Sequence, residues 1–189
     1  MHDDLGAGLS RIKFLSQSIL NKKLKDEIIK TELEKITSFS DEMSEKMGEI
    51  VWALNEKNDT LADLIAYTRS YAVEYLANHN IQCDAKTPFN LPGNFITGET
   101  RRNIFLSVKE CLHNIVKHSG ANRVCFSVEL DGQMKIIIHD NGKGIDLDHR
   151  RAFSNGIDNI NKRMKEINGE VKFFNDQGTR VSLSIPLTL

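Results

Sequence analysis

Residues 135–144, Lys-Ile-Ile-Ile-His-Asp-Asn-Gly-Lys-Gly, are the stretch that decides the fold. The apolar run from Ile136 to Ile138 predicts a buried strand, and Asp140 with two glycines follows where such a strand would end at a pocket. A glycine in that place lets the backbone approach a bound group closely. Asn-Gly pairs are also common in ordinary turns, so the surrounding sequence must distinguish a pocket from a turn.

Short strands and helices surround this stretch. The expected strands form two hairpins, at 124–138 and 170–185. Helical spacing of apolar residues covers 99–117 and 157–167, whereas the segment after Asn78 is expected to be loop-rich. Helices combined with an antiparallel-rich sheet predict an α+β sandwich for this part of the chain.

The amino-terminal part has a different pattern, in which apolar positions recur at alternating spacings of four and three. They form one stripe on each of two helices: Leu5, Leu9, Ile12, Ser16 and Ile19, then Ile29, Leu33, Ile36, Ser40, Met43, Met47, Ile50 and Leu54. A seam of this kind is typical of coiled coils. Two such helices joined by a polar turn at 21–23 form a hairpin that cannot bury both stripes by itself. We therefore expect a homodimer, in which two hairpins make a four-helix bundle.

A further helix is expected between these two parts. Its apolar positions begin at Leu61, and Thr60 or Asp59 could cap its first turn. The expected organisation is a helical hairpin at 1–57, a connecting helix at 58–79 and an α+β domain at 80–189.

Composition and charge exclude several classes of protein. The 189 residues are 40% hydrophobic and 27% charged, and a formal net charge of -1 gives no basic field that would attract nucleic acid. Cys83, Cys111 and Cys125 have neither metal-ligand nor redox-pair spacing and are expected to be reduced thiols. No apolar run approaches the ~18 residues that span a bilayer, and the amino terminus lacks a signal-peptide profile. These features predict a cytoplasmic chain that contacts neither nucleic acid nor membrane.

The helix expected at 99–117 presents polar groups that could bind a charged ligand. Glu110 and Asn114 lie four residues apart on one face, and Lys117 and His118 follow a turn later. Lys117 could offset the negative charge of such a ligand, and His118 could form a hydrogen bond to it. Taken alone, these residues also fit an ordinary solvated helix face.

Residues 81–189 resemble the GHKL ATP-binding fold of gyrase, the heat-shock ninety chaperones, histidine kinases and the mismatch-repair ATPases. Four motifs carry the resemblance, in the order 110–114, 140–144, 154–160 and 178–179. The resemblance implies ATP and Mg2+ as ligands. It assigns the magnesium ion to Asn114 and a hydrogen bond from the adenine amino group to Asp140.

Four further positions take roles from the same resemblance. Gly142 and Gly144 would let the backbone approach the nucleotide. Gly156 would expose the N–H groups and the positive dipole end of a helix to phosphate oxygens. Thr179 would reach the adenine.

The third motif departs from the family at Ser154, where glycine is more usual. The segment between Gly144 and Ser154 corresponds to the ATP lid and is short. Its Arg150 and Arg151 could contact phosphate, although ordinary surface arginines fit equally well.

The first residues add a candidate phosphoryl acceptor. His2 begins the sequence His-Asp-Asp-Leu-Gly-Ala-Gly-Leu, which resembles the phosphoacceptor box of the histidine-kinase subfamily that includes nitrate and membrane-fluidity sensors. A neutral imidazole is nucleophilic, and the adjacent Asp3 could orient it and accept its remaining proton. His2, Asp3 and Glu110 are therefore the candidate catalytic residues. Subfamily members often have glutamine where this chain has Ala7, so the resemblance predicts kinase chemistry without predicting phosphatase activity.

Together the motifs predict the core of a two-component sensor histidine kinase. ATP would phosphorylate His2, and the phosphohistidine would pass its phosphoryl group to an aspartate in the receiver domain of a response regulator. Two alternatives use the same pocket: a conformational ATPase in which Glu110 activates water, and a dimeric scaffold that binds nucleotide without turnover. A phosphoacceptor is expected inside a helix, so a start at Met1 predicts a fragment of a longer sensor, whose other part could be membrane-bound.

Overall fold

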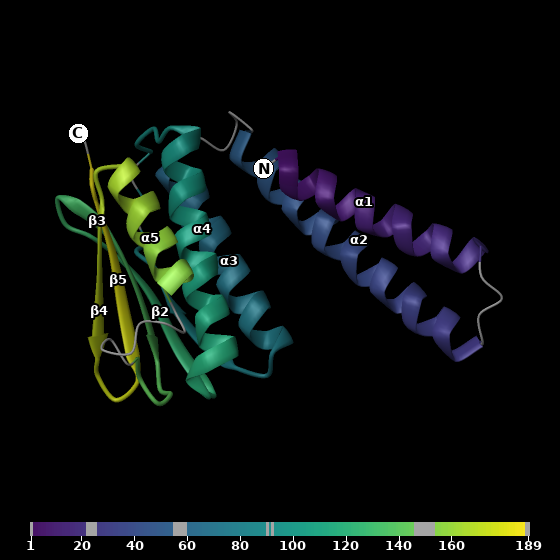
Figure 1. The fold of residues 1–189 in the computed structure, drawn as a ribbon. Coiled ribbons are helices and arrows are strands. Elements are labelled where there is room, and N and C mark those ends of the chain that lie inside the picture. Colours follow the sequence, from purple (N-terminus) through teal and green to yellow (C-terminus); the bar gives the residue numbers. More distant parts are fainter. Residues whose placement is uncertain are drawn as a thin grey trace. The chain divides into compact units, whose positions relative to one another are not determined.

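The computed structural model of the chain describes residues 2–21, 26–54, 60–89, 91, 93–145 and 154–187. Its contacts divide the chain into two compact units, Met1–Leu54 and Asn55–Leu189. The first unit is helical and the second combines helices with a sheet, which confirms the predicted α+β fold class (Figure 1). Within the described ranges, no helix is both long enough and apolar enough to cross a bilayer.

The first unit is a hairpin of two helices, α1 (His2–Asn21) and α2 (Asp26–Leu54), which pack side by side (Figure 1). Several large apolar side chains of this hairpin remain exposed: Leu9, Phe14, Ile28, Leu33, Met47 and Val51. Leu9, Leu33 and Met47 belong to the predicted stripes. A second hairpin remains the expected cover for them, and the homodimer stays a prediction.

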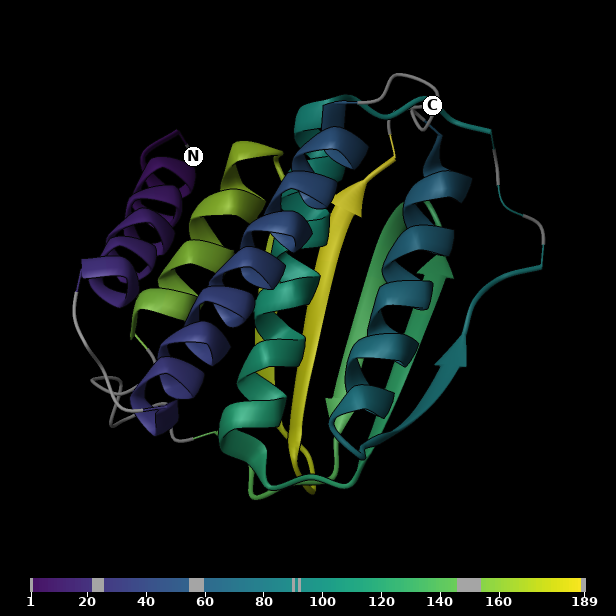
Figure 2. The same ribbon diagram turned by 90° about the vertical axis from the view of Figure 1, so that its right-hand side faces the viewer.

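The second unit is built on a five-stranded sheet. Its strands are β1 (Gln82–Lys86), β2 (Arg123–Leu130), β3 (Gln133–Asp140), β4 (Glu170–Asn175) and β5 (Thr179–Pro186). Their order is β1-β2-β3-β5-β4, with a parallel β1–β2 pair and antiparallel pairs elsewhere. Three helices, α3 (Leu61–Asn78), α4 (Gly98–Asn114) and α5 (Ser154–Glu166), cover one face of this sheet (Figure 2). Both predicted hairpins are present.

Strand β1 lies in the segment that was expected to be loop-rich. It pairs in parallel with β2, with Cys83 opposite Val124. The strand has only five residues, with exposed ends at Gln82 and Lys86 and half-buried residues between them. A short, polar edge strand has little of the apolar alternation that identifies a strand in sequence, because one of its sides has no neighbour.

The core lies between the sheet and the three helices. Alternate residues of β3, namely Met134, Ile136 and Ile138, are fully buried on the helix-facing side. Each such side chain contributes about 1.5–3 kcal/mol when it leaves water. Asp140 continues the same alternation and is only 2% exposed. The strand therefore delivers a carboxylate to the helix-covered side of the sheet at its last residue.

Helix α3, expected as a connector, packs within the second unit. Thr60 is its N-cap, and the Thr60 hydroxyl accepts a hydrogen bond from Asp63 N at 3.1 Å. Leu61, Leu64 and Leu76 are fully buried. These contacts make α3 part of the core of the second unit, while the domain boundaries at 57 and 79 stay predictions.

Candidate functional site

A pocket lies where the end of α4, the end of β3, the start of β5 and the first turns of α5 meet. Its lining residues are Cys111, Asn114, Ile115, His118, Ser119, Asp140, Gly144, Ile145, Ile157, Phe173, Thr179 and Val181. All four sequence motifs contribute to this lining. Five predicted site residues are thereby brought together: Asn114, His118, Asp140, Gly144 and Thr179.

Asp140 is held in place by its own turn. The Gly142 N–H donates a hydrogen bond to Asp140 Oδ1 at 2.8 Å. A buried carboxylate needs such a partner, because taking a charge out of water without one is costly. The bond fixes the side chain at the pocket wall, where it can accept a further hydrogen bond from a ligand.

Two glycines allow the backbone to close around Asp140. A β carbon on Gly142 would overlap the backbone oxygen of Ser119, and one on Gly178 would overlap the backbone oxygen of Asp140. Gly178 also has a φ of +134°, which disfavours other residues. The second and fourth motifs therefore need glycine for contacts within the protein itself, whatever they do toward a nucleotide.

Asn141 anchors the second motif to the start of β2. Its Oδ1 accepts hydrogen bonds from Asn122 N at 3.1 Å and Arg123 N at 3.0 Å, and its Nδ2 donates to Asn122 Oδ1 at 2.8 Å. The Lys143 N–H also donates to the Ser119 carbonyl at 3.0 Å. The Asn-Gly pair predicts Asn141 only as part of a turn, and no local pattern identifies its partners 18 and 19 residues away.

The candidate residues of α4 have different surroundings. Asn114 and His118 line the pocket, with His118 in a π-helical turn, η2 (Ile115–Ser119), that follows α4. Glu110 is not in the lining, but its Oε1 lies against Gly156 of α5. Lys117 is exposed and also lies outside the lining.

The charge of Lys117 acts on a neighbouring residue. Partial burial, and then the positive charge of Lys117, lower the pKa of His113 below its ordinary value. An imidazole with a lowered pKa is largely neutral at pH 7. Lys117 thus brings positive charge near this end of α4, while Glu110 acts on the same imidazole with the opposite charge.

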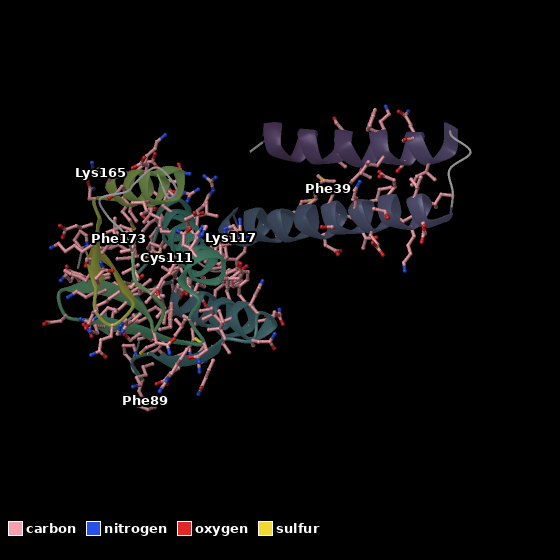
Figure 3. All side chains as sticks on the ribbon, turned by 60° about the horizontal axis from the view of Figure 1, so that its bottom comes forward. Phe39, Phe89, Cys111, Lys117, Lys165 and Phe173 are labelled. Carbon is pink, nitrogen blue, oxygen red and sulfur yellow. The ribbon has the colours of Figure 1, made fainter. Side chains whose placement is uncertain are left out.

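Most of the apolar wall of the pocket was not predicted from the sequence, including Cys111, Ile115, Phe173 and Val181. In Figure 3, Cys111 and Phe173 lie among the side chains that fill the domain. Burial raises the pKa of the Cys111 thiol to about 12, so this side chain is neutral and acts as part of the wall. Such residues look like ordinary core positions in the sequence, and only their proximity to the motifs could have indicated them.

Several predicted residues lie outside the described structure. The backbone of α1 begins at His2, but the side chains of His2 and Asp3 are not among those described. Arg150, Arg151 and the rest of 146–153 are also outside the described residues. The roles of these residues stay predictions.

The carboxyl-terminal half of the chain matches a known family. Residues 99–189 match the family described as Histidine kinase-, DNA gyrase B-, and HSP90-like ATPase. The chain is 27% identical over 191 residues to the Sensor histidine kinase YvfT of Bacillus subtilis (strain 168), covering 99% of this chain and 48% of YvfT. It is 32% identical over 88 residues to Sensor histidine kinase LiaS of the same strain, covering 45% of this chain and 24% of LiaS. The chain thus spans half or less of the length of these relatives.

Solved structures with the same fold cover nearly the whole chain. The histidine kinase domain from Erythrobacter litoralis EL346 blue-light activated histidine kinase has a TM-score of 0.62 at 17% identity, covering 98% of this chain and 94% of that one. The Acinetobacter baumannii histidine kinase AdeS has a TM-score of 0.59 at 14% identity, covering 96% of both chains. At these identities the likeness establishes a shared fold.

The fold and the pocket define a GHKL-type ATP-binding domain, preceded in the sequence by a helical hairpin. Because YvfT is similar over 99% of the chain, the helical hairpin and the ATP-binding domain together match a histidine kinase transmitter, the core of a two-component kinase. Neither a conformational ATPase nor a silent scaffold is favoured, because the relative aligned over 99% of the chain is a sensor histidine kinase.

Proposed function

We propose that this chain uses ATP to phosphorylate His2 and then passes the phosphoryl group to an aspartate in the receiver domain of a response regulator. The observation that carries the proposal is the meeting of four separate sequence motifs in one pocket, through Asn114, Asp140, Ile157 and Thr179. The similarity to sensor histidine kinases supports this reaction class.

The pocket suits a purine nucleotide. Asp140 offers a buried acceptor for an exocyclic amine, and Thr179 lines the same pocket. Cys111, Phe173 and Val181 supply the apolar surface that a flat base needs. Gly156, in the first turn of α5, is proposed to present N–H groups to the phosphates, and Gly142 and Gly144 to keep the backbone close to the nucleotide.

The chemistry of Asn114 also suits magnesium. Its amide oxygen is a hard donor, and magnesium needs few protein ligands because it keeps water and phosphate oxygens. In the part of the chain that the structure describes, no three His, Cys, Asp or Glu side chains are grouped as metal ligands. When bound, the ion would neutralise charge on the phosphates. Lys117 and His118 are proposed to add positive charge and a hydrogen bond there.

The proposed transfer is an in-line displacement at the γ-phosphorus. A neutral ring nitrogen of His2 forms the new N–P bond while the bond from phosphorus to the β,γ-bridging oxygen breaks, and ADP leaves with that electron pair. Asp3 orients the imidazole and takes the proton from its other nitrogen. Glu110 of α4 is proposed as the third catalytic residue of this transfer. Most of the rate would come from positioning and from charge stabilisation.

The partners of the reaction are also proposals. Pairing of the 1–57 hairpin with a second copy would cover the exposed Leu33 and Met47, so we propose a homodimer. The response regulator would dock near His2. We propose that the transfer takes place in the cytoplasm.

The experiment that tests this function is incubation with magnesium and γ-labelled ATP. Acid-labile, base-stable label on the protein would identify phosphohistidine. The label should disappear in His2→Gln and in Asn114→Ala. His79→Gln is the matched control, because His79 is an exposed histidine at the end of α3, outside the pocket lining, and should leave the label unchanged.

Other outcomes would contradict the proposal in different ways. Free phosphate released at equal rates by the parent and His2→Gln would favour a conformational ATPase. Nucleotide binding without either label or free phosphate would favour a scaffold.

A further inference from the structure

Asn175, the last residue of β4, forms two hydrogen bonds with the backbone of Ile145. Its Oδ1 accepts from Ile145 N at 2.8 Å, and its Nδ2 donates to Ile145 O at 2.8 Å. One carboxamide therefore satisfies both backbone polar groups of a residue 30 positions away. An adjacent strand would pair with the backbone in the same way.

The backbone that Asn175 holds is part of the pocket wall. Ile145 and the preceding Gly144 both belong to the lining, whereas Asn175 does not. Gly144 has a φ of +81°, and a β carbon there would lie only 2.8 Å from Asn175 Oδ1. Glycine at position 144 thus lets the carboxamide approach, and the carboxamide in turn fixes where Ile145 lies.

The opposite end of the same motif is fixed independently. Asn141 is tied to Asn122 and Arg123 by its own side-chain hydrogen bonds. The segment from Asp140 to Ile145 is consequently held at both ends by asparagine side chains. Loss of the two hydrogen bonds between Asn175 and Ile145 would leave Asp140 and its turn in place. It would free only the part of the pocket wall that Gly144 and Ile145 form.

We propose that Asn175 is a positioning residue for ATP binding, which holds Gly144 and Ile145 in the shape that the nucleotide fits. This inference rests on the proposed function of the pocket. A wall that is already ordered loses little conformational freedom when the ligand binds, so a positioning residue of this kind raises affinity. Asn175 is exposed and has no place in the transfer chemistry, so its loss should act on binding and leave the chemical step unchanged.

Two substitutions test the role of the carboxamide. Asn175→Ala removes both hydrogen bonds. Asn175→Asp preserves the shape and the acceptor but places a carboxylate oxygen against the Ile145 carbonyl in place of a donor. With two hydrogen bonds at stake, we expect the Kd and KM for magnesium-ATP to rise roughly tenfold in both variants, with kcat for His2 labelling changed less than about twofold.

Asp176→Ala is the matched control. Asp176 is the next residue, it is exposed, its side chain pairs with Arg180 at 3.5 Å, and it is not in the pocket lining. This variant should bind magnesium-ATP like the parent in calorimetric titration. Thermal unfolding of each variant provides the folded fraction, and Asn175→Asp carries the test if Asn175→Ala melts below the assay temperature.

The outcomes separate this inference from the proposed function. Parent-like ATP binding by Asn175→Asp would overturn the inference, because the hydrogen bond donated to the Ile145 carbonyl would then not be needed for ATP affinity. A fall in kcat at unchanged KM would overturn it as well. If the parent chain itself binds no ATP, the proposed function fails and the inference fails with it.

Discussion

The Glu110 carboxylate of α4 lies against the Cα of Gly156 in α5, so that a β carbon at position 156 would overlap Glu110 Oε1. The same β carbon would come within 3.5 Å of Asn114 Nδ2. The first and third motifs therefore meet directly, and the absence of a side chain at Gly156 leaves room for both polar groups of α4.

Gly156→Ala should separate binding from stability. Glu110 Oε1 is the end of a flexible side chain and can move aside, and alanine in a helix is favoured over glycine by up to about 1 kcal/mol. We expect the free energy of unfolding in urea to stay the same or rise. ATP affinity should fall roughly tenfold, because the methyl group displaces Glu110 and crowds the α5 amides.

The control for Gly156→Ala is Gly48→Ala in α2, where a β carbon would meet nothing within 4 Å. It should gain similar helix stability and keep full ATP affinity. A Gly156→Ala protein that binds ATP as tightly as the parent would contradict the assignment of this helix terminus to the phosphates.

Gly178→Ala should destabilise the fold itself. Here the β carbon would meet the backbone of Asp140, which cannot move as a side-chain end can, and φ is +134°. We expect a loss of about 2–4 kcal/mol in the free energy of unfolding. Gly132→Ala is the comparison, because φ is +62° but nothing lies within 4 Å, and it should cost only about 1–2 kcal/mol. Equal losses in the two variants would show that the contact with Asp140 carries no extra cost.

Much of the second unit could be predicted because its signals are local in the sequence. The alternation that ends at Asp140 and the capping of α3 by Thr60 both depend on residues within a few positions of each other. The order of the motifs supplied the rest, since each of them alone also fits a turn or a solvated helix face. Four of the five predicted residues in the lining come from these motifs, and the fifth, His118, follows the first motif by one helical turn.

What could not be predicted depends on contacts between distant residues. Asn175 meets Ile145 across 30 positions, and an exposed asparagine at a strand end has no pattern that specifies such a partner. Phe173 alternates like any half-buried strand residue, although it lines the pocket. The edge strand β1 was not predicted because its short, polar sequence lacks an apolar alternation. It pairs with a neighbour on only one side, as expected for such a strand.

Two thiols should resist alkylation in the folded protein. Burial raises the pKa of Cys111 to about 12 and that of Cys83 to about 11, where the nearby Cys125 adds to the effect. At pH 8 their thiolate fractions are then on the order of 0.0001 and 0.001, and the thiolate is the reactive form. A short pulse of iodoacetamide followed by peptide mass spectrometry should label Cys125 first, and all three cysteines only in urea. Rapid native labelling of Cys111 would contradict its burial in the pocket wall.

The pKa of His113 should report the charge of Lys117. Partial burial lowers this pKa, and the positive charge of Lys117 lowers it further. Because the folded pKa is below the unfolded value of about 6.5, the unfolded chain binds the proton more readily. Above about pH 6.5, His113 is neutral in both states and costs no stability. As the pH falls from about 6.5 toward the folded pKa, the unfolded chain takes up the proton first, so the free energy of unfolding decreases.

Removing the charge with Lys117→Gln should raise the folded pKa of His113 toward its ordinary value and flatten that fall in stability. Proton NMR titration of the imidazole measures the pKa, and urea unfolding between about pH 5 and pH 7 measures the stability. Lys165→Gln, an exposed lysine of α5 that does not contribute to the lowered pKa, should leave both quantities unchanged. A His113 pKa that stays constant or decreases in Lys117→Gln would show that the charge of Lys117 does not lower it.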